Sequence, residues 1–323
     1  MKGLTDIPGI KVGHASDFDA LTGCTAILCE AGAVGGVDIR GSATGTQEID
    51  VLRPHHVTNR VHAITLAGGS AFGLEAASGV RRYLEQRGIG FKTRAGVVPL
   101  VPAAILYDLG IGKSNVRPTR EMGEAAAAAA TAGPVAEGAV GAGTGATLGK
   151  LLGFDRAMKS GIGSYTVWLD GPLAGIRVAA LVALNPVGDI RDPETAKLIA
   201  GARQSPDSMD LADAALQMKR GVAVGGFQNQ NTTLAVVATN ARLTKVQTTK
   251  LAEQAQLGLA RTIFPVHTMS DGDTVFALSI GDETANPDVL GVAAAEAVAQ
   301  AVLRAARNAP GMGGLPGLAD RPL

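Results

Sequence analysis

Short runs of apolar residues, rich in β-branched side chains, recur along the whole chain and restrict its possible folds more than any other feature. Runs of this length and composition are typical of buried strands. They occupy residues 25–28, 63–66, 167–169, 176–184, 234–239 and 274–280. A chain with this many separate strands must bury its sheet surface against other layers.

Helical patterns lie between some of these runs. Residues 70–86 carry one apolar stripe, and Gly88 follows them at the position of a left-handed helix cap. Thr244 and Gln247 have the spacing of a capping box, which predicts a helix that runs to about Ile263. The sequence therefore alternates between strand and helix signals.

Two further helical stretches, 125–130 and 291–307, are built mainly from small residues. Alanine and glycine allow a helix to pack closely on a sheet, so we expect layered α/β sheets with outer helices, not a helix bundle. At 323 residues the chain is long enough for one large α/β unit or for two domains.

The charge balance bears on possible partners. Lys plus Arg and Asp plus Glu number 29 each, and aromatic residues make up only 3% of the chain. No net positive field would attract nucleic acid or an anionic membrane, and few rings could stack on bases, so we expect neither partner. A net charge of zero favours self-association, which predicts a homo-oligomer.

The two cysteines and the amino terminus bear on location. Cys24 and Cys29 are five residues apart, which would point them to opposite faces of one strand, so we expect no disulfide between them. The first residues lack an apolar signal core, and no window reaches the length of a bilayer span. These features predict a soluble, reducing, cytoplasmic setting.

Two segments interrupt the regular pattern. Residues 186–224 are charged, contain proline and are weakly periodic, which predicts an exposed excursion. The tail from Pro310 to Leu323 is rich in glycine and proline and is predicted to be loose.

A polar cluster precedes the apolar run 234–239, in the stretch GFQNQNTTLAVVATN. A threonine hydroxyl is a poor nucleophile without a base in reach, but cutting the bond between Asn231 and Thr232 would give Thr232 a free amine with a pKa of about 7.7 to 8.0. That amine could serve as the base. The alternatives are an ordinary strand threonine and a glycosylation acceptor, the latter disfavoured without a secretory signal.

Two charged motifs offer helpers for such chemistry. Asp271 and Asp273, separated by one glycine, could turn toward one site and pass a proton, or could form a plain acidic turn or a cation site. Lys150 ends a Gly/Ala-rich run, but Leu151 follows where a phosphate-binding loop needs Ser or Thr. It is either a surface lysine or a positive group in a glycine-lined site.

Polar residues at strand ends supply further candidates. Asn185, before a proline, could donate to an oxyanion or bond its own turn. Tyr107 is either a core tyrosine or a site residue. The turn of Gly68, Gly69 and Ser70 could line a pocket or simply cap a helix. The five histidines have no metal-binding spacing, so we expect neither a metal nor a cofactor.

Seven motifs resemble, in order, those of the self-processing β-peptidyl aminopeptidase and L-aminopeptidase/D-esterase family, nearest to its nylon-oligomer (6-aminohexanoate-oligomer) hydrolase branch. They are LTDIPGIKVGH, LAGGSAFGLEAASGVRRYLE, VPAAILYDLG, GAGTGATLGK, ALNPVGD, NTTLAVVATNARLTK and PVHTMSDGDTVFAL. The resemblance covers nearly the whole chain. It implies an αββα sandwich of the aminopeptidase/ornithine acetyltransferase type, with the logic of an N-terminal nucleophile (Ntn) hydrolase.

The resemblance also implies a single catalytic domain, 1–323, that cleaves itself into an α-chain, 1–231, and a β-chain, 232–323. Thr232 matches the nucleophile and Asn231 the residue before the cut. The implied helpers are Lys150 as the active-site lysine, Asn185 as an oxyanion donor, Asp271 and Asp273 as proton-transfer groups, Tyr107 as a hydroxyl facing the nucleophile, and Gly68, Gly69 and Ser70 as pocket lining.

The expected function is hydrolysis of small peptides or short oligo-amides through an acyl-enzyme, by a homotetramer of cleaved αβ units. Two alternatives stay open. The first is acyl transfer like that of ornithine acetyltransferase, which shares the fold and the self-cleaving threonine. The second is a catalytically inactive scaffold.

Overall fold

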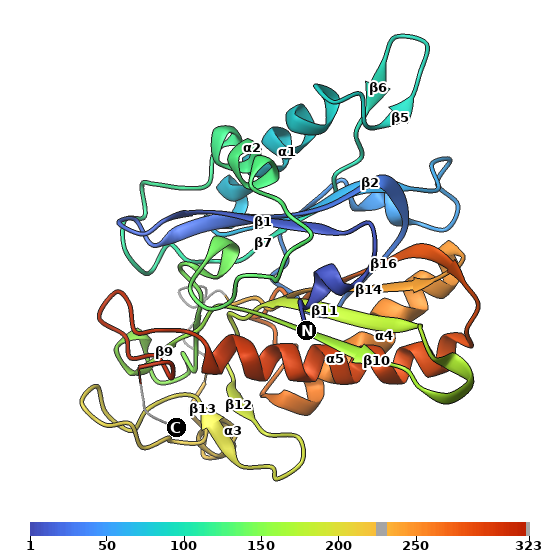
Figure 1. Ribbon diagram of the computed structural model, residues 1–323. Helices are drawn as coiled ribbons and strands as arrows, with labels where there is room; N and C mark the ends of the chain where they lie inside the picture. Colours follow the sequence, from blue (N-terminus) through green and yellow to red (C-terminus); the bar gives the residue numbers. More distant parts are fainter. Residues whose placement is uncertain (224–230, 321–323) are drawn as a thin grey trace.

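The computed structural model describes residues 1–223 and 231–320 as four stacked layers, helix, sheet, sheet and helix (Figure 1). Helices α1 (Ala76–Glu85) and α2 (Arg120–Ala128) cover one outer face. Helices α4 (Lys245–Thr262) and α5 (Pro287–Arg307) cover the other. The predicted αββα architecture is confirmed.

Strand β2 (Thr22–Ile39) is shared by both sheets. Its first half pairs with β1 and β4, its second half pairs with β16, and the register shifts between Leu28 and Ala33. Gly32 lies at this irregularity and has a φ of +83°, a backbone conformation that residues with a side chain disfavour. The two packed sheets are therefore joined through β2, which hydrogen-bonds to strands of both.

The sheet under α1 and α2 is mixed. It contains β1 (Lys11–Asp17), β4 (Val61–Ala67), β7 (Ala103–Ile105) and β3 (Thr46–Gln47). The sheet under α4 and α5 runs in the order β10 (Ile162–Trp168), β11 (Arg177–Ala183), β14 (Leu234–Ala241), β16 (Thr274–Glu283) and then β2. In this second sheet β14 and β16 are parallel neighbours, whereas the other pairs are antiparallel.

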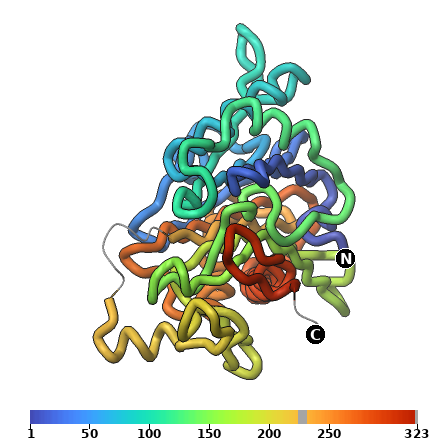
Figure 2. The backbone as a smooth tube through the Cα atoms, turned by 90° about the vertical axis from the view of Figure 1, so that its left-hand side faces the viewer, coloured from blue at the N-terminus to red at the C-terminus, as the bar shows by residue number. Residues whose placement is uncertain are grey.

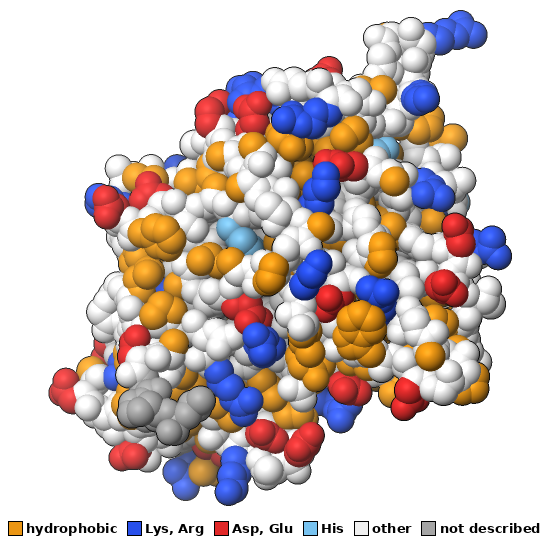
Figure 3. Space-filling view, viewed as in Figure 1, with side chains coloured by type: hydrophobic (Ala, Val, Ile, Leu, Met, Phe, Trp, Pro, Cys, Tyr) orange, Lys and Arg blue, Asp and Glu red, His pale blue; other side chains and the backbone are white. Residues whose placement is uncertain are grey.

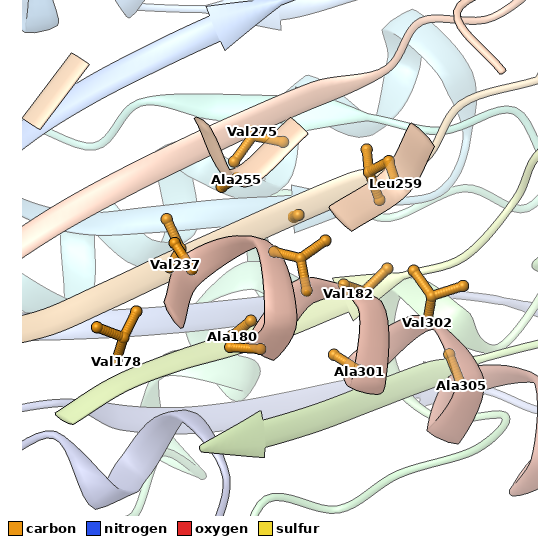
Figure 4. Close-up of a cluster of buried hydrophobic side chains, with 14 of the residues drawn as sticks. Val178, Ala180, Val182, Val237, Ala255, Leu259, Val275, Ala301, Val302 and Ala305 are labelled. Carbon is orange, nitrogen blue, oxygen red and sulfur yellow. The ribbon is translucent and has the colours of Figure 1, made fainter. Parts of the chain in front are cut away.

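Three apolar clusters fill the spaces between the layers. Ile27, Leu66, Leu181, Val236 and Phe276 belong to the cluster between the two sheets. A second cluster lies under α1 and α2. The largest packs α4 and α5 on their sheet, where small side chains let the helices approach closely; Figure 4 labels Val178, Ala180, Val182, Val237, Ala255, Leu259, Val275, Ala301, Val302 and Ala305.

Local sequence explains where the long helices begin. Thr244 and Gln247 form the predicted reciprocal capping box of α4. Asn286 caps α5, and Pro287 occupies its first turn, where a missing N–H costs nothing. Helix α5 is long and apolar enough to span a bilayer, contrary to the sequence expectation. However, 72% of its 18-residue apolar segment is buried inside the protein. That burial is the pattern of a core helix.

All six predicted strands are present, most of them longer than their apolar runs. The 70–86 helix begins as a 3-10 turn, and the 125–130 signal marks only the end of α2, which Thr119 caps. Cys24 and Cys29 are both free, and they lie in different apolar clusters on the two faces of β2, as expected. Strand β1 was not predicted because glycine, histidine and serine break its apolar pattern.

The excursion contains more structure than its sequence suggests. Strands β12 (Asp189–Arg191) and β13 (Leu198–Ala200) pair with each other, β12 also pairs with β15 (Ile263–Phe264), and helix α3 (Ala214–Lys219) follows. Buried Asp189 accepts the backbone N–H groups of Ala202 and Ala214 at 2.8 and 2.6 Å. The predicted end at residue 224 lies outside the described residues.

The carboxyl-terminal tail is docked and not loose as far as residue 320. Leu315 is buried against Leu21, Ile111 and Ala157, and the amide of Lys159 donates to Pro316 at 2.9 Å. Glycine and proline in this tail therefore shape turns that pack, which composition alone did not distinguish from disorder. Residues 321–323 lie outside the described part.

The shorter elements connect and decorate the layers. The hairpin of β5 (Phe91–Lys92) and β6 (Val97–Val98) projects from the body in both backbone views (Figures 1 and 2). Acidic and basic side chains are interspersed over the face in Figure 3. The remaining elements are β8 (Thr147–Leu148), β9 (Met158–Lys159) and the 3-10 turns Leu4–Asp6, Ile49–Leu52, Ser70–Glu75, Gly141–Gly143, Phe154–Arg156 and Gly171–Leu173.

Candidate active site

The parallel pairing of β14 with β16 creates the site. Leu234 lies opposite Thr274, so the residues that lead into the two strands lie side by side. Asn231 forms an isolated parallel bridge with Asp271. Strand β11 runs antiparallel to β14 and delivers Asn185 to the same edge of the sheet. Three polar motifs far apart in sequence therefore meet at one place.

Thr232 is buried, with only 2% of its surface exposed. Its backbone N–H donates to the carbonyl of Asn185 at 3.0 Å, and its hydroxyl donates to the carbonyl oxygen of Asn231 at 2.5 Å. The same Asn231 oxygen accepts the backbone N–H of Gly272 at 2.8 Å. The peptide between Asn231 and Thr232 is thus contacted by a hydroxyl and by an amide donor.

Lys150 is buried in the same cluster, not on the surface. Its Nζ donates to the Asn185 side-chain oxygen at 2.8 Å, to the Asn185 carbonyl at 3.0 Å and to the Thr147 carbonyl at 3.2 Å. Burial lowers the pKa of Lys150 to about 7, although the charges of Asp271 and Asp273 act in the opposite direction. A lysine in this environment can exchange a proton near neutral pH.

Asn185 is fully buried and connects several groups. Its Oδ1 accepts from Lys150 and from the Thr147 amide, whereas its Nδ2 donates to the carbonyl of Tyr107 at 3.1 Å. The Asn185 amide was expected to donate to an oxyanion. One of its two N–H groups is already used in the hydrogen bond to Tyr107.

The two aspartates lie just before β16 and are nearly inaccessible, at 1% exposure each. Asp271 accepts the hydroxyl of Thr268 at 2.6 Å. Asp273 accepts the backbone N–H of Thr233, next to Thr232, at 2.7 Å. Burial, together with the smaller effect of the Asp273 charge, raises the pKa of Asp271 to about 6. This pair is part of the buried cluster and not a solvated acidic turn.

Tyr107 reaches the cluster through its backbone carbonyl. Its half-buried ring lies toward Gly110, and the expectation that its hydroxyl faces Thr232 stays a prediction. The next residue, buried Asp108, accepts the N–H of Gly69 at 2.6 Å. This hydrogen bond holds the 68–70 turn close to Tyr107. The role of Gly68, Gly69 and Ser70 as pocket lining also stays a prediction.

The structure adds three side chains that sequence reasoning did not select. His267 contacts Asp273, Asp108 holds the 68–70 turn, and buried Lys159 donates to the carbonyls of Gly143, Ala146 and Ser160. Two of them belong to the family motifs: His267 stands in PVHTMSDGD, and Asp108 directly follows Tyr107. The spacing of the histidines bears on metal binding and carries no sign that His267 pairs with a carboxylate.

Comparison with known proteins bears on this arrangement. The model of Peptidase family S58 matches residues 2–319. An uncharacterized aminopeptidase of Mycobacterium leprae (strain TN) is 40% identical over 354 residues, covering 98% of this chain and 93% of that protein. A 6-aminohexanoate-oligomer endohydrolase of Kocuria sp. (strain KY2) is 34% identical over 321 residues, covering 94% and 85% respectively.

Solved structures share the fold at lower identity. The L-aminopeptidase D-Ala-esterase/amidase of Ochrobactrum anthropi, described as a variant of the Ntn hydrolase fold, superposes with a TM-score of 0.74 at 19% identity and covers 98% of this chain and 88% of that one. A β-aminopeptidase of Burkholderia sp. superposes with a TM-score of 0.70 at 24% identity, covering 98% and 90%.

Proposed function

The chain belongs to peptidase family S58 and is a hydrolase of amide bonds, and we propose that it cuts itself between Asn231 and Thr232 and then uses Thr232 as its amino-terminal nucleophile. One observation carries this proposal. The Thr232 hydroxyl lies 2.5 Å from the carbonyl oxygen of the peptide to be cut, inside a buried cluster of ionisable groups.

In the self-cleavage step, the Thr232 oxygen attacks the carbonyl carbon of Asn231. The hydroxyl proton passes to a nearby base, the C–N bond breaks, and the nitrogen takes up a proton to become the free amine of Thr232. Water then hydrolyses the resulting ester and leaves a carboxyl group on Asn231. The N–H of Gly272, 2.8 Å from the carbonyl oxygen, would stabilise the negative charge that develops there.

In turnover, the freed amine acts as the base for its own hydroxyl, with an ordinary pKa of about 7.7 to 8.0. The hydroxyl attacks the substrate amide, the amine component leaves with a proton, and water releases the acyl group. Lys150 and Asp271, with pKa values moved toward neutrality, are suited to pass protons during both halves of the reaction.

The names of two relatives, an uncharacterized aminopeptidase and a 6-aminohexanoate-oligomer endohydrolase, support a choice of substrate class. We propose small peptides or short amide oligomers as substrates of this chain, cleaved through an acyl-enzyme on Thr232.

The test is Thr232→Ala beside wild type and Thr262→Ala, a matched control that removes a buried hydroxyl in α4. Wild type and Thr262→Ala should give chains of about 23 and 9 kDa on denaturing electrophoresis, in proportion to residues 1–231 and 232–323 of the 32.7 kDa chain. Both should cleave amides of α-, β- and 6-amino acids. Thr232→Ala should stay intact and inactive; cleavage at the same bond in this variant would overturn the proposal.

A further inference from the structure

His267 contacts one oxygen of Asp273 twice. Its ring Nδ1 lies 2.9 Å from Oδ2 of Asp273, and its backbone N–H donates to the same oxygen at 3.1 Å. The His267 side chain is only 18% exposed and that of Asp273 only 1% exposed. A hydrogen bond to a carboxylate in such a setting is strong because little water competes for it.

The other oxygen of Asp273 connects this contact to Thr232. Oδ1 accepts the backbone N–H of Thr233 at 2.7 Å, and Thr233 directly follows Thr232. A continuous chain of hydrogen bonds therefore runs from the imidazole through the carboxylate to the backbone beside the proposed nucleophile. The orientation of the Asp273 carboxylate therefore depends on the partners of both of its oxygens.

The backbone of His267 is fitted to this contact. Its φ of +56° lies in the left-handed region, which is uncommon for residues other than glycine and which asparagine, aspartate and histidine adopt more often than most. In this conformation the backbone N–H and the ring of His267 both contact the same oxygen of Asp273. Strained backbone of this kind is concentrated at functional sites.

We propose that His267 is a positioning residue, which holds Asp273 oriented so that Asp273 can fix the backbone at Thr232. The inference rests on the proposed function of Thr232. His267 acts through Asp273 in both self-cleavage and turnover.

The expected effect is on the rate of the chemical step. Asp273 lies near Asp271 and Lys150 as well as His267. A carboxylate that loses one of its anchoring donors can rotate away from the Thr233 amide. Loss of the imidazole should therefore lower kcat more than it changes KM.

Two substitutions separate the hydrogen bond from the backbone conformation. Both glycine and asparagine tolerate the left-handed region. His267→Gly removes the ring, whereas His267→Asn keeps a side-chain N–H at the position of Nδ1. His56→Ala is the control for losing a partly buried histidine, since the side chain of His56 bonds only Thr58 among the described residues.

With 6-aminohexanoate oligomers or an amino-acid anilide as substrate, His267→Gly should lower kcat about 10- to 100-fold with a smaller change in KM. It should slow self-cleavage as well. His267→Asn should restore most of kcat and most of the self-cleavage rate. Thermal melting should show that all variants are folded. A His267→Gly enzyme with wild-type kcat and self-cleavage rate, or equal losses in both variants, would overturn the proposal.

Thr232→Ala, run in parallel, separates the two hypotheses. If that variant is inactive while His267→Gly behaves like wild type, only the role of His267 is wrong. If Thr232→Ala still cleaves itself and its substrates, the proposed function is wrong.

Discussion

The side-chain amine of Lys150 lies 2.8 Å from the amide oxygen of Asn185, whose backbone carbonyl in turn accepts the N–H of Thr232 at 3.0 Å. Lys150 also donates to that carbonyl. Asn185 therefore connects the buried amine of Lys150 to the proposed nucleophile. The two strands that present Asn185 and Thr232 are adjacent in the sheet, so this geometry is held by the fold's main hydrogen-bonded ladder.

Lys150→Met should lower the rates of self-cleavage and turnover together, by roughly 10²- to 10⁴-fold, the usual contribution of a positioned acid or base. The effect on both reactions is expected because they share one site. Lys245→Met is the control, since Lys245 is also buried but donates to Val51 and Arg53. Quantified band intensities and single-turnover kinetics provide the measurement. Wild-type rates in Lys150→Met would exclude a direct role for this lysine.

The pH dependence should report Asp271. Burial raises its pKa to about 6, so the working carboxylate is lost as the pH falls through that value. We expect kcat/KM of the wild type to fall in two steps as the pH is lowered, first as the Thr232 amine is protonated at about pH 7.7 to 8.0 and again below about pH 6 as Asp271 is protonated. Asp271→Asn should be slower at pH 7 and should lack the second step. A variant that keeps the step near pH 6 would show that another group titrates there.

Gly272→Ala should impair the site without unfolding the protein. A Cβ at this position would meet the Thr232 hydroxyl oxygen at 2.6 Å and the Ala43 carbonyl at 2.7 Å. Accommodating such an overpacked methyl costs about 1–3 kcal/mol and should displace the hydroxyl. We expect slow self-cleavage and low turnover in a protein that still melts cooperatively. Normal self-cleavage would mean that the close contact between Gly272 and Thr232 is not needed.

Asp189→Ala should destabilise the excursion. This fully buried carboxyl accepts two backbone N–H groups, from Ala202 and Ala214. Leaving both donors without a partner should cost about 2–4 kcal/mol in the free energy of unfolding, measured by urea denaturation. Asp170→Ala on the exposed 3-10 turn should change it by less than about 0.5 kcal/mol. Equal stability of the two variants would contradict this role for Asp189.

Local sequence signals predicted the elements that depend on local physics. The capping box at Thr244 and the apolar runs of β14 and β16 are visible in the chain because propensity and burial act on neighbouring residues. The bend in β2 was not predictable in the same way. Its two halves pair with strands from different sheets, and nothing in the residues around Gly32 specifies those partners.

The candidate site was only partly predictable for the same reason. Thr232 and Asp271 stand out because they come just before apolar runs, and Lys150 stands out because it ends a Gly/Ala-rich run. The contact between His267 and Asp273 depends on a left-handed backbone and a tight loop, and one histidine in a sequence carries no sign of either. The inward position of the docked tail depends likewise on long-range packing around Leu315.

The central claim is that a cut before Thr232 creates the working nucleophile, and amino-terminal sequencing of an active preparation tests it most directly. Two sequences are expected, one from the original amino terminus and one that begins Thr-Thr-Leu-Ala. Activity should rise in step with the second sequence as purified precursor is incubated. Full activity from a preparation that yields only the original amino terminus, or a second terminus at another residue, would contradict the account.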